Sequence, residues 1–449
     1  MDSYYTEKSS KTLPAECEKL SRISKRRLQA FLSPLLNLLS EVLDKRLVRT
    51  FYLLSEVLSS LSKSRHSLQI TTLGCALLGA FQSRAGMKRI HRLLDSDKWE
   101  ASLLIDYIKQ TCKTHIEQIP DKSFRLLLWD DSQVEKHETI HGESLCPVRS
   151  SKFKRLIRIR PDYYNPPTKS PAFVAGMHWI GLVACGLQSL PMVYTFDFWS
   201  TRGASKDKWF KRHLKVLIKV NKELADSVIH VFDRGFCGKN WISVLLQLNC
   251  RFLIRWNGGY NLYNEKGELK KTYRHSLGKK AVSTRKVWDM KRKCYRKAGV
   301  LFMKVIHPYV PEQTLYLVIC RPGKKGQSPW YLITSEPVEN AGQAWRIVFA
   351  YSRRWLIEMA FRFNKSEMGI ESIRVTSWEK RIKLIAIITV IYAFLLSLLM
   401  YGNGIIAKYL FIFATDRKQK RYREASIPLY HLREILDFLW NQIPSGKFG

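Results

Sequence analysis

The chain has 449 residues, of which 46% are hydrophobic and 12% aromatic, and this composition excludes an intrinsically disordered protein. Its 75 lysines and arginines, against 38 aspartates and glutamates, leave a formal net charge of +37. Such a charge predicts a polyanionic partner, namely DNA, RNA or an anionic membrane surface. The length and the aromatic content favour a large folded nucleic-acid enzyme over a short basic ribosomal or chromatin protein.

The nine cysteines are scattered along the chain, without a CxxC pair or a closely spaced framework. This spacing argues against structural zinc and against disulfides. The N-terminal stretch has no apolar signal region, so the sequence favours a reducing cytoplasm.

Residues 1–120 are expected to form a helical N-terminal domain, because leucines recur there at helical spacing. The stretch shows no recognition-helix signature. Two interpretations stay open: the helices pack only on one another, or their basic face holds DNA ends.

Strands alternate with helices in the expected pattern of residues 121–256. The sequence FRLLLW predicts a buried strand that ends at Asp130, and VIHVF predicts a second one that ends at Asp233. Two apolar runs separate them within residues 173–200. The other elements expected here are an amphipathic helix over 206–224, whose Phe210, Leu214, Leu217 and Leu224 share a face, a helix over 240–248, and a strand over 251–256.

Residues 257–338 break this alternation and are expected to form a β-rich insertion, with strands at 300–306, 314–320 and 330–334. A long helix is predicted over 341–368 and ends before Gly369. The pattern therefore predicts an α/β fold: an RNase H-like core, interrupted by the insertion, between a helical N-terminal domain and a helical C-terminal region. The expected boundaries are 1–120, 121–256, 257–338, 339–376 and 377–449.

One apolar segment in the C-terminal region, residues 384–400, has almost the length of a membrane span. Arg381 and Lys383 precede it, and Gly402 and Gly404 follow it. We interpret it as a buried core helix, and we expect no membrane association.

Two aspartates follow apolar strands, where a carboxylate can leave the sheet and face a metal ion. They are Asp130 and Asp233, and the second is followed by Arg234 and Gly235. Enzymes that use two divalent ions on phosphodiesters need two or three convergent carboxylates. A single aspartate at a strand end is also a common turn former, so its position alone does not identify a metal ligand.

The predicted helix after the insertion carries a polar stripe made of Tyr351, Arg354, Glu358 and Lys365. Their spacing places them on one side of a helix. One interpretation is a phosphate-handling helix at a cleft, in which the glutamate binds metal. The alternative is a solvated helix with an ion pair between Arg354 and Glu358.

The same four residues are similar to the tyrosine-arginine-glutamate-lysine (YREK) signature of DDE-type bacterial insertion-sequence transposases. VFDRGF at 231–236 resembles the second aspartate motif of that family, and Asp130, Asp131 and Ser132 resemble the first, which is Asp-x-Thr or Asp-x-Ser. Asp130 keeps this pattern and is the predicted ligand, with Asp131 as the alternative.

The resemblance implies that Asp130, Asp233 and Glu358 are catalytic residues and ligands of two Mg²⁺ ions, for which Mn²⁺ can substitute. It also implies contacts with DNA phosphates and with a flipped or stacked base. The expected phosphate contacts are Tyr351, Arg354, Lys365 and Arg234, and the candidates for base stacking are Trp256, Trp288 and Trp330.

Other motifs compete with this interpretation. His137 and His141 match the HExxH zinc pattern, which requires a helix, whereas a loop or strand is expected here. The basic runs 291–297 and 417–423 are either solvated surfaces or phosphate tracks. No Walker-type phosphate loop is present, so no nucleotide cofactor is expected.

The sequence thus predicts a cytoplasmic, nucleoid-associated transposase that cleaves double-stranded DNA at terminal inverted repeats and joins it to target DNA as a homodimer. Two alternatives stay open. One is an RNase H-like nuclease that cuts without joining, and the other is an inactive DNA-binding descendant.

Overall fold

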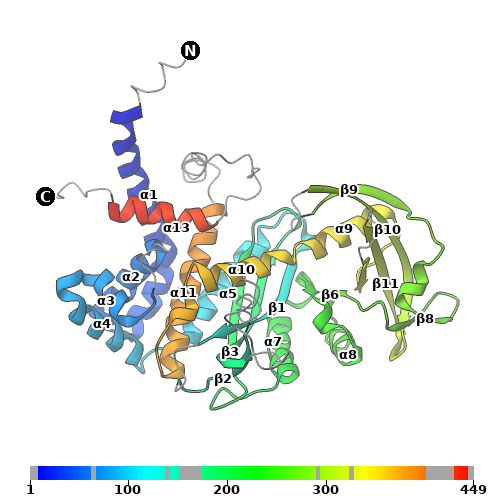
Figure 1. Cartoon of the computed structure of the whole chain (residues 1–449), viewed down its shortest axis with the longest axis horizontal. Coiled ribbons are helices and arrows are strands. Elements are labelled where there is room, and N and C mark those ends of the chain that lie inside the picture. The colour runs from blue at the N-terminus through cyan, green and yellow to red at the C-terminus, as the bar shows by residue number, and fades with distance from the viewer. Residues whose placement is uncertain are drawn as a thin grey trace, which may run out of the picture.

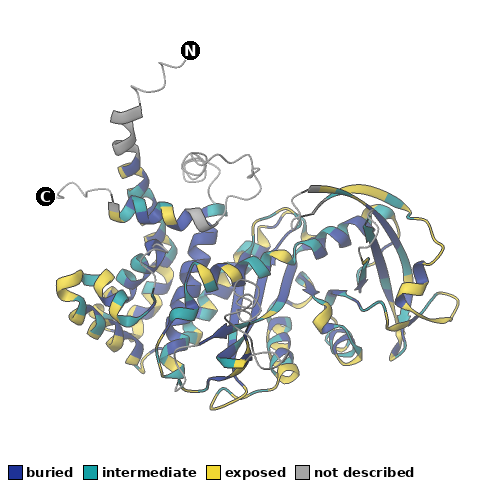
Figure 2. Ribbon diagram, in the orientation of Figure 1, coloured by how far each residue is buried: buried dark blue, intermediate teal, exposed yellow. Residues whose placement is uncertain are grey.

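The computed structural model describes residues 9–61, 67–136, 142–150, 173–289, 294–322, 328–400 and 429–442. Helices gather at one end of the molecule and a large mixed sheet extends through the rest of it (Figure 1). The buried core runs continuously from the helical end into the sheet (Figure 2).

The N-terminal helices form because their leucines repeat on one side of each helix. Leu28, Leu32, Leu35 and Leu39 follow helical spacing and are completely buried. Asp44 caps the second helix by accepting hydrogen bonds from the backbone N–H groups of Arg46 and Leu47. The helices of this end are α1 (Ser9–Val42), α2 (Lys45–Ser60), α3 (Ile70–Leu78), α4 (Ser83–Asp95) and α5 (Ala101–Glu117).

The central sheet begins with β1 (Leu126–Glu135), which lies between an antiparallel and a parallel neighbour. Its antiparallel partner is β3, which also pairs with β2 and β4, and its parallel partner is β5, followed by β6. The bounds of these strands are β2 (Cys146–Arg149), β3 (Phe173–Cys185), β4 (Met192–Trp199), β5 (Ile229–Phe232) and β6 (Arg251–Arg255).

The predicted end of the first strand is wrong, because β1 continues through Asp130 to Glu135. The reason lies in its neighbours. Pairing with β5 covers only Leu126–Leu128, whereas pairing with β3 holds β1 extended over its whole length. Asp130 therefore lies just beyond the end of β5, where the strand is free on one side.

Residues 257–338 contribute antiparallel strands that continue the same sheet, because β12 pairs with β6. The longest two form a hairpin, β10 (Cys294–His307) and β11 (Val310–Pro322), with Tyr309 near its turn. The remaining strands are β7 (Asn261–Tyr263), β8 (Leu269–Lys271), β9 (Ser283–Asp289) and β12 (Trp330–Thr334).

Helices cover the sheet. The predicted single helix over 341–368 is wrong in one respect: it is broken at Arg353 and Arg354 into α9 (Ala341–Ser352) and α10 (Trp355–Ser366). The other helices are α7 (Trp209–Leu224), α8 (Lys239–Gln247), α11 (Trp378–Met400) and α13 (Leu429–Asp437), with short 3-10 turns at 80–82, 122–124, 225–227, 234–236, 272–276 and 370–372 and a π-helical turn at 438–442.

The helix α11 fills the seam between the helical end and the sheet. Among the described residues it alone is long and apolar enough to cross a membrane, by length and composition only. However, 89% of its most apolar window is buried inside the protein. Lys383, in its second turn, donates a hydrogen bond to the Ser96 carbonyl at 2.8 Å, so this charged part of the helix also contacts protein.

Candidate active site

Three acidic side chains from three separate elements converge at the edge where β5 ends. Asp130 comes from the middle of β1, Asp233 follows β5 directly, and Glu358 lies in the first turn of α10. Gly181 is the register partner of Asp130 on β3, and a Cβ there would lie 2.5 Å from the ring of Phe361. The glycine therefore allows α10 to pack closely on the sheet beside Asp130.

The guanidinium of Arg354 contacts all three carboxylates. Its Nη1 donates to Asp130 at 2.8 Å, its Nη2 donates to Glu358, and its Nε lies 4.0 Å from Asp233. The ion pair with Glu358 that the sequence left open is thus present, but it belongs to a larger cluster. Because one guanidinium reaches all three groups, the carboxylates form one cluster.

Burial and neighbouring charges shift the pKa values of Asp130 and Asp233 in opposite directions. Burial raises the pKa of Asp130 to about 6, and the nearby Asp233 and Asp131 add to the rise, although Arg354 opposes it. Burial also acts to raise the pKa of Asp233, but the charge of Arg354 and hydrogen bonds from Arg234 and Tyr351 bring it below its usual range.

Tyr351 ties the helix α9 to the second aspartate. Its hydroxyl donates to Asp233 at 3.0 Å, and its ring meets Trp330 edge-on with centroids 5.2 Å apart. Of the three tryptophans named from the sequence, Trp330 therefore borders the acidic cluster. Trp256 is buried, and its ring contacts Tyr260 and His307 instead. The side chain of Trp288 lies outside the described residues.

Asp131 points away from the acidic cluster, toward α7. One of its oxygens lies 2.5 Å from Nε2 of His213, and the other accepts from Nε1 of Trp209 at 2.6 Å. The predicted apolar face of α7 is shifted as a result, because His213 is buried whereas Phe210 is exposed. A histidine within a leucine-rich helix was the only sequence signal for this contact.

The donor set suits a hard divalent cation, because it consists of three carboxylates that already surround one positive charge. In the described part of the chain, however, no three His, Cys, Asp or Glu side chains are arranged to hold a metal ion. The group that stands among Asp130, Asp233 and Glu358 is the guanidinium of Arg354.

Lys365, two turns further along α10, lines a neighbouring hollow of about 380 Å³. The hollow also contains Asp131, Arg149 and Trp209. Arg234, by contrast, is exposed on the turn that follows Asp233. The predicted phosphate contacts thus divide into Tyr351 and Arg354, which touch the acids, and Lys365 and Arg234, which flank them.

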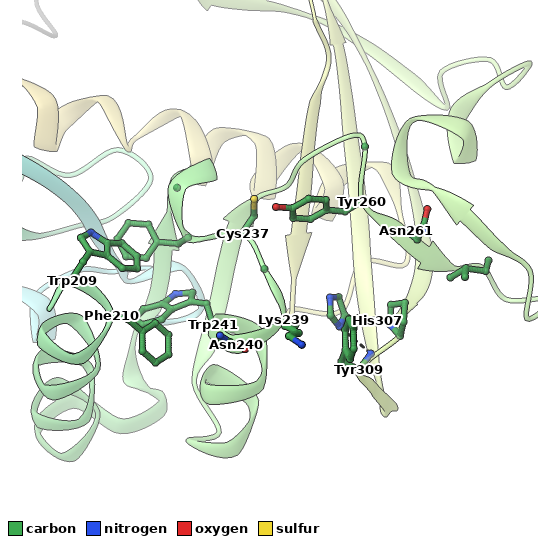
Figure 3. A pocket seen from close by; sticks show the side chains of 16 residues that line it. Trp209, Phe210, Cys237, Lys239, Asn240, Trp241, Tyr260, Asn261, His307 and Tyr309 are labelled. Carbon is green, nitrogen blue, oxygen red and sulfur yellow. Dashed lines mark hydrogen bonds between the residues drawn. The ribbon is translucent and has the colours of Figure 1, made fainter. Parts of the chain in front are cut away.

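A second hollow, of about 710 Å³, opens beside the turn after Asp233. Figure 3 shows Trp209, Phe210 and Trp241 on one side of it and Tyr260, His307 and Tyr309 on the other. Lys239 lies between the two groups, with its ammonium 4.8 Å from the centre of the Tyr309 ring. Sequence reasoning missed these aromatics because α8 and the β10–β11 hairpin meet only in the folded chain.

Two further sequence features cannot be placed. His137 and His141 of the HExxH match lie outside the described residues, as does the basic run 417–423. Of the run 291–297, only the part from Cys294 onward is described, and it forms the start of β10.

Residues 199–394 match the family model described as Transposase DDE domain. The match supports a DDE transposase, and it includes Asp233 and Glu358 but begins after Asp130. A solved structure, the cryo-EM structure of piggyBac transposase synaptic complex with hairpin DNA (SNHP), is 12% identical with a TM-score of 0.41. The alignment covers 89% of this chain and 72% of that chain.

Proposed function

We propose that this chain is the transposase of a bacterial insertion sequence, which cuts double-stranded DNA at the element's ends and joins it to a target. The observation that carries the proposal is the meeting of Asp130, Asp233 and Glu358 at one guanidinium, from positions far apart in the sequence. The domain match over residues 199–394 supports the same reaction class.

Asp130, Asp233 and Glu358 would hold two divalent ions, Mg²⁺ or Mn²⁺. When bound, such ions activate water or a 3′ hydroxyl and stabilise the leaving oxygen of the phosphodiester. With a pKa of about 6, Asp130 is mainly ionised at neutral pH and is able to act as a ligand. Arg354 offsets part of the negative charge of the three acids, and with ions bound it would be free to turn toward a phosphate.

The strand order supports an RNase H-like core for this site. The order β4-β3-β1-β5-β6 combines antiparallel strands on one side of β1 with parallel strands on the other. This arrangement puts the middle of β1 beside the end of β5, which is where Asp130 and Asp233 lie. The helix α10 then supplies Glu358 from above the same edge.

The two hollows beside the acids offer surfaces for DNA. Lys365 and Arg149 line one of them, and cations of this kind bind phosphates. Trp209, Tyr260 and Tyr309 expose ring surface in the other, where a base would stack without regard to sequence. Trp330, beside Tyr351, is the remaining candidate for base stacking.

The proposal includes a homodimer that pairs the two ends of the element in the nucleoid. It involves no nucleotide cofactor and no membrane. The net charge of +37 fits a protein that holds long stretches of duplex DNA.

The test uses the full chain, Mg²⁺ or Mn²⁺, and DNA that carries the inverted repeats flanking its coding region. Wild type is expected to cleave these ends and, with pre-nicked ends, to give joined products. Asp233→Asn and Glu358→Gln should lose both activities, whereas Glu265→Gln, an exposed carboxylate on the turn before β8, should retain them.

Two outcomes would contradict the proposal. Cleavage that never gives joined products would indicate a nuclease of RNase H type. Binding of DNA without any metal-dependent cleavage would indicate an inactive DNA-binding descendant.

A further inference from the structure

The helices α3 and α4 form a tightly packed pair at the end of the molecule opposite to β9–β11 (Figure 1). Four residues, 79–82, connect them. Gly79 ends α3 with a φ of +85°, a conformation that favours glycine and turns the chain sharply. Two helices joined by such a short turn have the layout of a helix-turn-helix unit.

Two glycines make the pair close. A Cβ on Gly86 would lie 2.2 Å from the carbonyl oxygen of Gly74, and a Cβ on Gly74 would lie 2.6 Å from the backbone nitrogen of Met87. No side chain fits at either position, so the backbones of α3 and α4 touch. This contact fixes how α4 is presented on the surface.

The helix α4 has one buried and one basic face. Gly86, Ile90, Leu93 and Leu94 are buried, and the helix packs against α2, α3 and α11. The opposite face is exposed and carries Arg84, Lys88, Arg89, His91 and Arg92. Its one acid, Asp95, lies in the last turn and pairs with Lys380 of α11.

The four arginines and lysines of this face pair with no carboxylate in the described part of the chain. The turn before α4 adds two exposed side chains, Gln82 and the fully exposed ring of Phe81. Arginine and lysine bind guanine edges, glutamine binds adenine, and apolar groups contact the thymine methyl. This turn and the first half of α4 thus present the side chains that read base edges.

We propose that α4 is a recognition helix that enters the major groove of double-stranded DNA. Gln82, Arg84 and Lys88 meet base edges there, and Arg89 and Arg92 bind the flanking phosphates. In helix-turn-helix units the N-terminal part of the second helix faces the bases in the same way. The inference rests on the proposed function, since the duplex would be the end of the mobile element.

Other polyanions fit this surface less well. A helix is about 10–12 Å wide with its side chains and fills the roughly 12 Å major groove of B-form DNA, whereas the major groove of A-form RNA is deep and narrow. A membrane-binding helix needs a free apolar face, but the apolar face of α4 is buried. Duplex DNA is therefore the ligand that matches both shape and charge.

In Figure 1 α4 lies at the left end of the molecule, whereas α10, which carries Glu358, lies near its middle. The proposed recognition helix is thus separate from the acidic cluster, so motif recognition and metal-dependent cleavage can be tested independently.

The test is a selection from duplexes with a randomised 20-base-pair core, using the purified full chain. Wild type is expected to enrich one motif. Arg84→Ala/Lys88→Ala should bind the selected duplex about a hundredfold more weakly, or roughly tenfold for each lost base contact, and should not enrich the motif. Arg84→Lys, which keeps the charge, should lose preference mainly at one base pair.

The matched control is Lys45→Ala/Arg46→Ala, which removes the same charge from exposed positions at the start of α2. It should enrich the wild-type motif. If Arg84→Ala/Lys88→Ala enriches the wild-type motif with unchanged affinity, or if wild type enriches none, the proposal is overturned.

Metal-dependent nicking of supercoiled plasmid separates this inference from the proposed function. On plasmid that lacks the selected motif, Arg84→Ala/Lys88→Ala should nick within about twofold of wild type, because this reaction needs the acids but no recognition of the motif. Loss of nicking in Asp233→Asn tests the active site alone, whatever the selection gives.

Discussion

The carboxylate of Asp131 lies 2.5 Å from the imidazole of His213, on the opposite side of β1 from the acidic cluster. Neighbouring residues of a strand point to opposite faces, so β1 can direct only one of its two aspartates toward Asp233 and Glu358. Asp130 has that direction. Asp131 instead anchors α7 to the sheet.

This difference predicts unequal effects of two similar substitutions. Asp130→Asn should reduce metal-dependent nicking about a thousandfold, which is about 4 kcal/mol of activation free energy. Asp131→Asn should reduce it about tenfold and lower the free energy of unfolding by about 1–2 kcal/mol, because a charged hydrogen bond is lost. Plasmid nicking and urea unfolding measure the two effects. An equal loss of nicking in both variants, with Asp131→Asn fully stable, would contradict the assignment.

Replacing Arg354 should make the protein depend on metal for stability. Arg354→Gln removes the positive charge between Asp130, Asp233 and Glu358, so the three carboxylates repel one another. We expect the free energy of unfolding to fall by about 1–2 kcal/mol in metal-free buffer. The loss is small because the side chains of Asp233 and Glu358 are 35% and 34% exposed, and solvent screens their repulsion. Millimolar Mg²⁺ should restore more stability to this variant than it adds to wild type, as measured by thermal unfolding.

Arg362→Gln is the control for that experiment, since Arg362 is exposed on the same helix. It should show the wild-type response to Mg²⁺. An Arg354→Gln protein that is as stable as wild type without metal would show that the three carboxylates do not repel one another in solution.

His230 should make the protein less stable as the pH falls. Burial lowers its pKa from 6.5 to about 3, and its Nδ1 accepts a hydrogen bond from Trp129 at 3.0 Å. Below pH 6.5 the unfolded chain binds a proton there that the folded chain does not. The free energy of unfolding is therefore unaffected by His230 above pH 6.5, and below that pH this residue lowers it by up to about 1.4 kcal/mol per pH unit.

The measurement is the free energy of unfolding between pH 6.5 and 5 in wild type and in His230→Gln, a comparison that cancels the titration of Asp130 because it occurs in both proteins. His230→Gln keeps an acceptor for Trp129 but has no proton to gain, so its stability should change less with pH than that of wild type. Identical slopes in both proteins would exclude a role for His230.

Gly181 should be needed for the position of α10. A Cβ at this residue would lie 2.5 Å from one ring atom of Phe361 and 2.7 Å from another, so Gly181→Ala must displace the helix or the ring. We expect about a tenfold loss of nicking and a destabilisation of about 1–3 kcal/mol, as for other overpacked cores. Gly259→Ala meets no atom closer than 3.5 Å and should keep the wild-type stability.

Local sequence patterns determined much of this protein. Apolar runs before Asp130 and Asp233 predicted the strands β1 and β5, and the spacing of Tyr351, Arg354 and Glu358 predicted helical structure, because strand and helix periodicities are local properties. Periodicity also predicted the amphipathic helix at 206–224. Its buried face, however, includes His213 and leaves Phe210 exposed.

Only the tertiary structure decided what depends on distant contacts. The direction of the Asp130 side chain follows from the pairing of β1 with β3 and β5. The contact of Arg354 with all three acids depends on its place at the break between α9 and α10. The close approach of α3 to α4 depends on Gly74 and Gly86. Each of these involves residues that are remote in sequence or a chain bend that periodicity does not encode, so the folded chain had to supply them.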